Sequence, residues 1–187
     1  MSILISGLLI FFVSHFYSTF RSREPEKDIK HKMGEKAYMG AYSVISALGL
    51  GLIIWGYKQA GVTEQLYVGF NFDYSLRLLL MLLAFIFLVA ANLPAGYIKS
   101  TLKHPMLVGV CIWSITHLID GATERQALLF GSFLIYSIID MVVVSSRASS
   151  SKTSSKIISW KSDAVAIVIG IVTYAITVIW LHAGLNV

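Results

Sequence analysis

Apolar runs close to 20 residues long recur along the whole chain, and they limit the fold more than any other feature. A helix rises about 1.5 Å per residue, so a run of that length matches a hydrocarbon core about 30 Å thick. Of 187 residues, 56% are hydrophobic and only 13% are charged. A soluble domain carries about twice that charged share. The sequence therefore predicts an all-α integral membrane bundle.

Six transmembrane helices are expected, in a single domain over residues 1–187. Five are long enough to cross the bilayer, but the fourth has about 13 residues, or about 20 Å of helix. Such a short helix needs a thinned bilayer or an end buried in protein. The first span lacks a preceding basic segment and a small-residue cleavage site, so we interpret it as a retained helix. The expected spans are Ile3–Phe20, Tyr38–Tyr57, Leu76–Ile98, Met106–Leu118, Ala127–Val144 and Ala164–Leu185.

The basic residues between these spans are distributed unevenly. Twelve lysines and arginines lie in the loops after the first, third and fifth spans, against three on the opposite side. The positive-inside rule then places both termini outside the cytoplasm. The net charge of +5 thus indicates helix orientation and contact with anionic lipid, and no nucleic-acid partner is expected. The twelve are Arg21, Arg23, Lys27, Lys30, Lys32, Lys36, Lys99, Lys103, Arg147, Lys152, Lys156 and Lys161; the three are Lys58, Arg77 and Arg125.

Three segments have a distinctive composition. Residues 145–162 are rich in serine and lysine, which predicts a flexible cytoplasmic linker. Residues 61–74 carry several aromatic side chains, which predicts an interfacial aromatic belt. The second span contains small residues that allow close helix packing. These small residues are Ser43, Ser46, Gly49 and Gly51.

Polar side chains within or beside the spans are the candidates for a functional site. Hydrocarbon penalises unpaired polar groups, so such residues are expected to bind a ligand or one another. Imidazole is the commonest protein ligand of transition metals, it also ligates haem iron, and helix bundles build such sites from facing helices. The alternative is that each histidine only stabilises packing through a hydrogen bond. The candidates are His15, His104, His117, Asp120 and Asp140, with Asn92 as a polar companion.

The expected depths of these residues group four of them together. His15 and Asp140 lie about 9 Å below the cytoplasmic interface, and Asn92 and His104 lie near the same end. We expect these four to share one pocket that faces the cytoplasm. His117 is about 20 Å from His104 along a continuous helix, so these two cannot bind one atom. By depth alone, His15 pairs better with His104 than with His117.

A dense motif occupies the fourth span. It reads HPMLxGxxxWxxxHL from His104 to Leu118, and LLFGSF follows at residues 128–133. The first span ends with His15, Arg21 and Arg23, and the chain continues with GEKAY from residue 34, LIIWGY from residue 52 and the stretch at 90–96. Together these segments resemble the NnrU family of bacterial membrane proteins over nearly the whole chain.

The resemblance implies a bacterial inner-membrane protein linked to nitrite and nitric oxide reduction, with periplasmic termini. The plant 15-cis-zeta-carotene isomerase is a relative that carries haem b, and its implicated iron ligands fall on His15 and His117. The resemblance therefore implies haem b between the first and fourth spans, with a redox or isomerase-type role and a hydrophobic small-molecule substrate. Ser114 stands where the isomerase has a cysteine tied to a redox ligand change, and a hydroxyl cannot replace a thiolate on iron.

Two other functions stay open at this stage. One is a non-enzymatic assembly or regulatory membrane protein. The other is a methyltransferase, because the HPxxxG element is similar to the S-adenosylmethionine-binding segment of isoprenylcysteine and phospholipid methyltransferases. The acidic pair of those enzymes is replaced here by residues 145–147, which read SSR. The sequence shows no nucleophile–base pair, phosphate loop or zinc site, and it does not determine the substrate, the catalytic residues or the oligomeric state.

Overall fold

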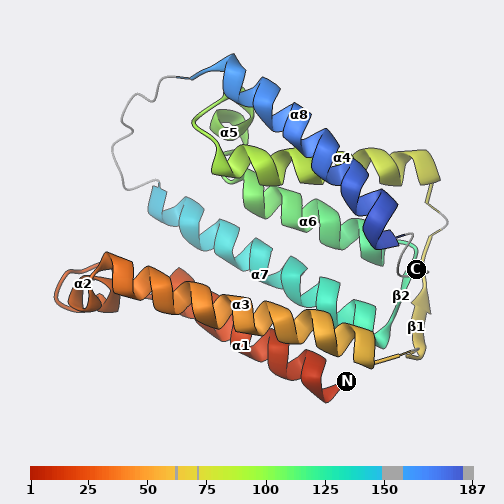
Figure 1. The fold of residues 1–187 in the computed structure, drawn as a ribbon, viewed down its shortest axis with the longest axis horizontal. Coiled ribbons are helices and arrows are strands. Elements are labelled where there is room, and N and C mark those ends of the chain that lie inside the picture. Colours follow the sequence, from red (N-terminus) through yellow and green to blue (C-terminus); the bar gives the residue numbers. More distant parts are fainter. Residues whose placement is uncertain (62, 71, 149–157, 183–187) are drawn as a thin grey trace.

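The computed structural model describes residues 1–61, 63–70, 72–148 and 158–182 (Figure 1). Within them the chain is almost entirely helical, with two short strands that pair antiparallel. The all-α membrane bundle is therefore confirmed. The elements are α1 Ser2–Phe20, α2 Ile29–Met33, α3 Glu35–Gln59, β1 Gln65–Val68, α4 Tyr74–Asn92, α5 Tyr97–Leu102, α6 Pro105–Leu118, β2 Gly121–Thr123, α7 Glu124–Ala148, α8 Trp160–Ile176 and a π-helical segment, η1 Thr177–His182.

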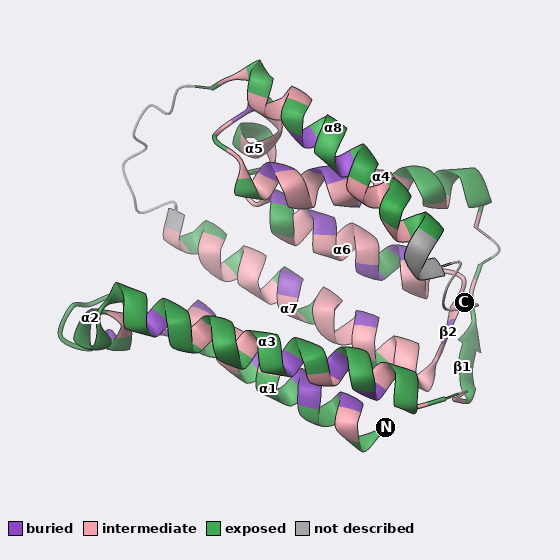
Figure 2. Ribbon diagram, in the orientation of Figure 1, coloured by how far each residue is buried: buried purple, intermediate pink, exposed green. Residues whose placement is uncertain are grey.

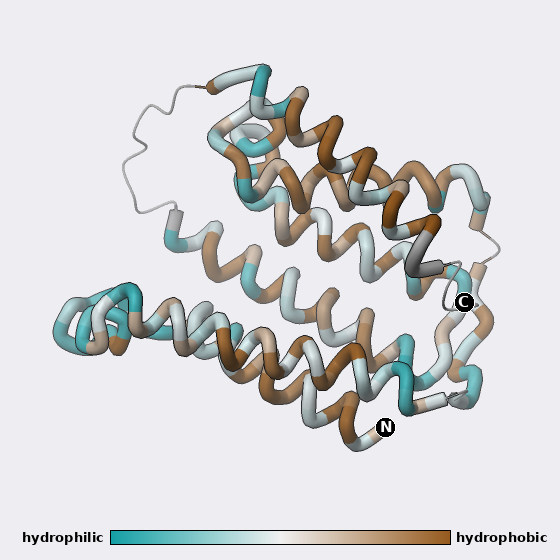
Figure 3. Tube along the Cα trace, viewed as in Figure 1, coloured by the Kyte–Doolittle hydropathy of each residue, from teal (hydrophilic) through white to brown (hydrophobic). Residues whose placement is uncertain are grey.

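The long helices account for the expected spans. In the described part of the chain, α1, α3, α4, α7 and the helix beginning at Trp160 are long and apolar enough to cross a membrane, and α6 is a shorter apolar helix. Figure 3 shows hydrophobic residues along the middle of the helices and hydrophilic residues at their ends. Many large apolar residues are exposed, and Figure 2 shows exposed residues along the outer faces of the helices. These faces contact lipid, so the protein is a multi-pass membrane protein.

Helix α7 lies between two groups of helices (Figure 1). On one side α1 packs against α3, and on the other α4 packs against both α6 and α8. Helix α7 itself packs against α1 and against α6. We call the end of the bundle with α2 and α5 the basic end, and the end with β1 and β2 the sheet end. Met1 and η1 both lie at the sheet end (Figure 1), as an even number of crossings requires.

The third expected span ends too late. Helix α4 stops at Asn92, and residues 97–102 form the separate helix α5. Leu93 is extended, with φ −97° and ψ 165°, because the following Pro94 disfavours the helical conformation. The ammonium of Lys99 donates hydrogen bonds to the carbonyls of Ala91 and Leu93, at 2.7 and 2.8 Å. It thereby satisfies carbonyls that the end of α4 leaves unpaired.

The expected linker at residues 145–162 is helical at both of its ends. Helix α7 continues to Ala148, and α8 begins at Trp160. Residues 149–157 lie outside the described residues, as does the expected end of the sixth span at Leu185.

The α1–α3 interface is closed by glycines at backbone-to-backbone contact. A Cβ on Gly7 would lie 2.6 Å from the backbone nitrogen of Ile53, and one on Gly56 would collide with the backbone of Leu4. Gly49, one of the expected packing residues, meets α1 in the same way, whereas Gly51 faces open space. Small residues let membrane helices approach closely, and here that approach leaves no room for a side chain.

The short helix α6 has its C-terminus covered by β1 and the residues after it. The hydroxyl of Tyr67 donates a hydrogen bond to the carbonyl of Leu118 at 2.5 Å. The N–H of Phe70 donates to the carbonyl of Ile119 at 3.1 Å. With 14 residues, α6 spans about 21 Å, too short for the hydrocarbon core. Protein groups satisfy its last carbonyls, which makes a helix end at membrane depth tolerable.

Candidate functional site

His15 lies on α1 inside an aromatic enclosure. Its Nδ1 donates a hydrogen bond to the carbonyl of Phe11 at 2.7 Å, and its ring stacks on the Phe11 ring at a centroid distance of 3.9 Å. The rings of Tyr42 from α3 and Tyr136 from α7 lie 5.1 and 5.7 Å away. Because a carbonyl only accepts hydrogen bonds, the neutral imidazole carries its proton on Nδ1 and a lone pair on Nε2.

A polar network lies one turn beyond His15 on α1. The Oγ1 atom of Thr19 is 3.0 Å from the His15 carbonyl oxygen and 2.7 Å from Oδ1 of Asp140 on α7. The Tyr136 hydroxyl lies 3.3 Å from the same Thr19 oxygen. Arg147 donates a hydrogen bond to the Thr19 carbonyl at 2.6 Å. The network therefore joins α1 to α7 and places a carboxylate next to the enclosure of His15.

His117 lies on α6 at its interface with α7. Its Nδ1 donates a hydrogen bond to the carbonyl of Trp113 at 2.8 Å. Its ring stacks on Phe130 of α7, with centroids 4.2 Å apart and planes 14° apart. The same reasoning as for His15 places the proton of the neutral ring on Nδ1 and a lone pair on Nε2. The two histidines thus have the same backbone hydrogen bond and different neighbours.

The two histidine enclosures are joined through α7. The ring of Phe133 lies 5.4 Å from Phe11 and 5.5 Å from Trp113, so it contacts an aromatic neighbour of each histidine. The resemblance implied a haem site between the helices of His15 and His117. In the structure α7 packs against both of these helices and contributes part of each enclosure.

The other candidate residues lie apart from this network, and the Asp120 carboxylate pairs with the guanidinium of Arg77. Asn92 ends α4 with an exposed side chain, and its amide donates to the carbonyl of Leu88 in its own helix, at 2.9 Å. His104 precedes Pro105 at the start of α6, and its Nε2 is buried without a hydrogen-bond partner in the described residues. Of the four residues expected to share a pocket, the structure thus links His15 and Asp140 through Thr19.

Sequence reasoning missed the aromatic residues of α7 that enclose both histidines. Phe130, Phe133 and Tyr136 follow one another at intervals of three residues, and Asp140 comes four residues later. Residues three or four apart lie on one face of a helix. This spacing predicts an aromatic face on α7 that leads to the carboxylate, and the structure contains that face.

Ser114 is fully buried, and its hydroxyl has no hydrogen-bond partner within the described residues. No group of three or more His, Cys, Asp or Glu that could hold a bare metal ion was found among the residues that the structure describes.

Comparison with protein families finds a match over residues 3–187 to the family described as NnrU protein. Comparison with curated proteins and with solved structures found no match. The family match includes both enclosed histidines, the HP motif at the start of α6 and the aromatic face of α7. Because it spans nearly all of the sequence, the chain belongs to the NnrU family.

Proposed function

We propose that this membrane protein binds haem b through His15 and His117. The observation that carries the proposal is the matched hydrogen bond of the two imidazoles, each from Nδ1 to the carbonyl four residues earlier. Metal-ligating histidines almost always donate their second ring N–H in this way, which fixes the tautomer and orients Nε2 as the ligand. Both rings are thus oriented for ligation, on helices that each pack against α7.

The donor set fits haem better than a bare ion. A porphyrin supplies the equatorial ligands of its iron, so one or two histidines complete the coordination. The rings around the two imidazoles, among them Phe11 and Phe130, provide an apolar surface for a macrocycle. Phe133 lies between the two enclosures. The experiment below therefore distinguishes haem ligation by both histidines from ligation by His15 alone.

When bound, haem would supply one-electron chemistry, and the chain would supply ligation, orientation and a dry pocket. The carbonyls of Phe11 and Trp113 hold the two imidazoles in position. Thr19 and Tyr136 hold the Asp140 carboxylate beside the His15 enclosure, where it favours positive charge. We assign the protein a redox or isomerase-type role on a hydrophobic small molecule, in nitrogen-oxide or isoprenoid metabolism. Ser114 offers no thiolate, so a cysteine-dependent ligand change is not part of the proposal.

We place the protein in a bacterial inner membrane with both termini in the periplasm. Support comes from the two ends of the bundle. The basic end carries Arg21, Arg23, Lys99 and Arg147, and Met1 lies at the opposite, sheet end. Cytoplasmic loops carry the excess of lysine and arginine, so the basic end faces the cytoplasm.

The test is the absorbance spectrum of the full chain, purified in detergent after expression with ample haem supply. Wild type should show a Soret band, and His15→Ala should lose it. His117→Ala should shift the band, because the haem would lose one of its two proposed histidine ligands. His31→Ala changes a histidine in the charged segment and should leave the spectrum unaltered.

A colourless wild-type preparation that elutes as a folded species would overturn the haem proposal. It would favour the assembly or regulatory role. Binding of S-adenosylmethionine by the same preparation would instead support the methyltransferase hypothesis. A Soret band that His117→Ala leaves unchanged and His104→Ala alters would replace His117 with His104 as the second ligand.

A further inference from the structure

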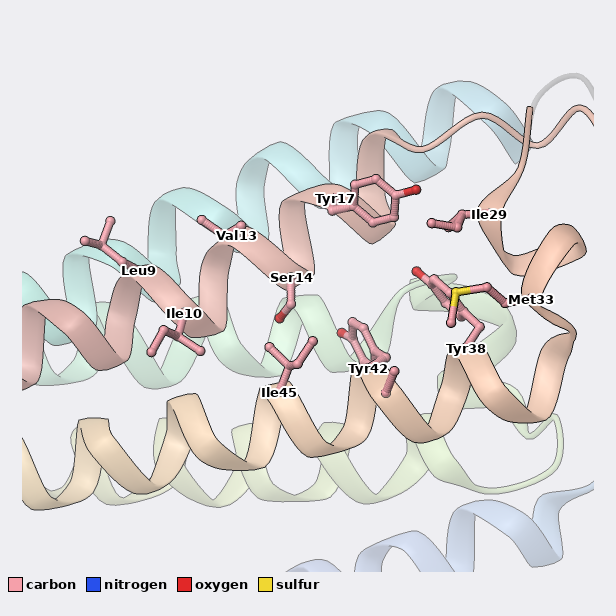
Figure 4. Close-up of a pocket in the computed structure, with 11 residues that line it drawn as sticks. Leu9, Ile10, Val13, Ser14, Tyr17, Ile29, Met33, Tyr38, Tyr42 and Ile45 are labelled. Carbon is pink, nitrogen blue, oxygen red and sulfur yellow. The ribbon is translucent and has the colours of Figure 1, made fainter.

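A groove of about 560 Å³ runs between α1 and α3 on the outside of the bundle, away from α7 (Figure 4). Leu9 and Val13 line it from α1, and Ala41 and Ile45 line it from α3. Val13 is 66% exposed, so this wall faces lipid. The groove is therefore an apolar channel that opens to the surrounding hydrocarbon.

The groove has the depth of one lipid leaflet. Leu9 and Tyr17 mark its two ends along α1, about 12 Å apart. One leaflet contributes about 15 Å to the hydrocarbon core. At the basic end, Ile29 and Met33 of α2 close the groove (Figure 4). A single acyl chain that enters from that leaflet matches both the length and the polarity of the walls.

Tyrosine hydroxyls lie at the closed end of the groove. Tyr17 and Tyr38 are placed there, next to α2 (Figure 4). Tyr38 is only 8% exposed, and its hydroxyl has no hydrogen-bond partner in the described residues. The guanidinium of Arg21 lies 5.3 Å from the centre of the Tyr38 ring. An unused buried donor beside a cation is suited to a negatively charged oxygen.

The segment around this end carries an excess of positive charge. Residues 21–36 contain six basic and four acidic side chains. Three of the acidic residues form ion pairs, which leaves three of the bases without one among the described residues. The ion pairs are Arg21–Asp28, Lys27–Glu24 and Lys30–Glu35, and the remaining bases are Arg23, Lys32 and Lys36.

Arg23 is crowded by other cations. Its partial burial and the nearby charges of Arg21 and Arg147 lower its pKa, although it stays protonated. Asp28 partly offsets this effect, but its carboxylate is paired with Arg21. The neighbourhood therefore favours an added anion.

We propose that the α1–α3 groove is a binding site for an anionic phospholipid. One acyl chain lies between Val13 and Ala41, and the phosphate accepts a hydrogen bond from Tyr38 and pairs with Arg23. A zwitterionic lipid would fill the groove equally well but would leave the excess positive charge less well compensated. The groove is on the opposite face of α1 from α7, although Tyr42 lines both the groove and the His15 enclosure.

Native mass spectrometry of the full chain in detergent tests the site. We would titrate phosphatidylglycerol and phosphatidylcholine of equal chain length into delipidated protein. We expect wild type to bind phosphatidylglycerol about fivefold more tightly than phosphatidylcholine for each unpaired basic residue near the headgroup, because choline offsets the phosphate charge in phosphatidylcholine. Equal affinity for the two lipids would overturn the proposal.

Two pairs of variants locate the site. Ala41→Trp fills the groove and should abolish the preference for phosphatidylglycerol, whereas Ala47→Trp, at an exposed position on the same helix, should retain it. Arg23→Gln should lower affinity for phosphatidylglycerol about fivefold and affinity for phosphatidylcholine less, because choline already offsets the charge of its phosphate. Lys58→Gln also removes one positive charge, but at the sheet end, and should change the affinity for neither lipid. If the members of either pair bind alike, the lipid does not occupy this groove.

Discussion

The two histidine enclosures differ in what surrounds rings that are otherwise held alike. His15 lies beside the rings of Tyr42 and Tyr136, and the Tyr136 hydroxyl, Thr19 and Asp140 meet one turn away. His117 lies against the aromatic faces of Trp113 and Phe130. Hydroxyls and a carboxylate can rearrange hydrogen bonds when a charge changes nearby, whereas aromatic faces only pack. Helix α7 therefore places a hydroxyl and a carboxylate near His15 and an aromatic face against His117.

The helix interfaces behind the two enclosures also differ. His15 stands on the α1–α3 pair, where Gly7 and Gly56 bring backbones into contact. His117 stands on the α6–α7 pair, where side chains such as Phe130 fill the interface. Backbone atoms cannot move aside, but side chains can adopt other rotamers. The α1–α3 pair should therefore tolerate added volume less well than the α6–α7 pair.

The largest effect is expected from Gly56→Leu. The new side chain would collide with the backbone of Leu4, so α1 and α3 must separate, at a cost of about 3 kcal/mol or more. The midpoint of unfolding in a titration with sodium dodecyl sulfate measures this loss. Gly51→Leu is the matched control, because a Cβ at Gly51 has no neighbour within 4 Å. It should change the free energy of unfolding by less than about 0.5 kcal/mol. Equal midpoints would show that the α1–α3 contact is not close.

Phe130→Ala should have the next largest effect. Phe130 is 5% exposed and stacks on His117, so its truncation leaves a cavity. The free energy of unfolding should fall by about 3 kcal/mol. Ile135→Ala, on the same helix but 60% exposed to lipid, should cost much less. The same titration compares the two variants. A greater loss for Ile135→Ala would contradict the assignment of faces on α7.

Tyr136→Phe should act on one enclosure only. It keeps the ring beside His15 but removes the hydroxyl that lies 3.3 Å from Thr19, at a cost of about 1 kcal/mol. The ¹⁵N chemical shifts of the His15 ring nitrogens should change, and those of the His117 ring nitrogens should not. Tyr97→Phe, at an exposed position, controls for loss of a hydroxyl. Equal shifts at both histidines would remove the distinction between the two enclosures.

The smallest effect concerns acid stability near α1. The hydrogen bond from Arg21 holds the pKa of Asp28 below its usual range. This carboxylate therefore stabilises the fold above the pKa that it has in the unfolded chain, about 3.9. The stabilisation is lost as the pH falls through the lower pKa of the folded state.

Hydrogen exchange of the α2 amides measures this effect. In wild type these amides should become less protected as the pH falls below about 4, after correction for the intrinsic exchange rate. In Asp28→Asn the protection should be low already at neutral pH and should change little with pH. If Asp28→Asn showed the same dependence of protection on pH as wild type, this ion pair would be excluded as the cause.

The sequence predicted the helices and their order with little error. Hydrocarbon forces each long apolar run into a helix, so the spans follow from hydropathy alone. The short fourth span was predicted and is present as α6. The end of α4 was not, because its apolar run continues past Pro94, and the separate helix α5 begins only after the Gly96 turn. A proline in an apolar run ends some membrane helices and kinks others, and the local sequence does not distinguish them.

The candidate site was predicted only in part. Polar residues are rare in membrane spans, so His15, His117 and Asp140 could be identified one by one. Their partners could not, since helices that are apolar on every side do not reveal which face meets which neighbour. Gly49 contacts α1 and Gly51 does not, although the two look alike in the sequence.

Composition and apolar length thus determined by themselves that this chain forms membrane-spanning helices, because each helix satisfies its own backbone in hydrocarbon. Only the tertiary structure decided that α7 packs against both helices that carry these histidines, that Thr19 binds Asp140 and that β1 covers the end of α6. Those features depend on contacts between residues distant in sequence, and the energies that select them come from the shapes of packed faces rather than from hydropathy.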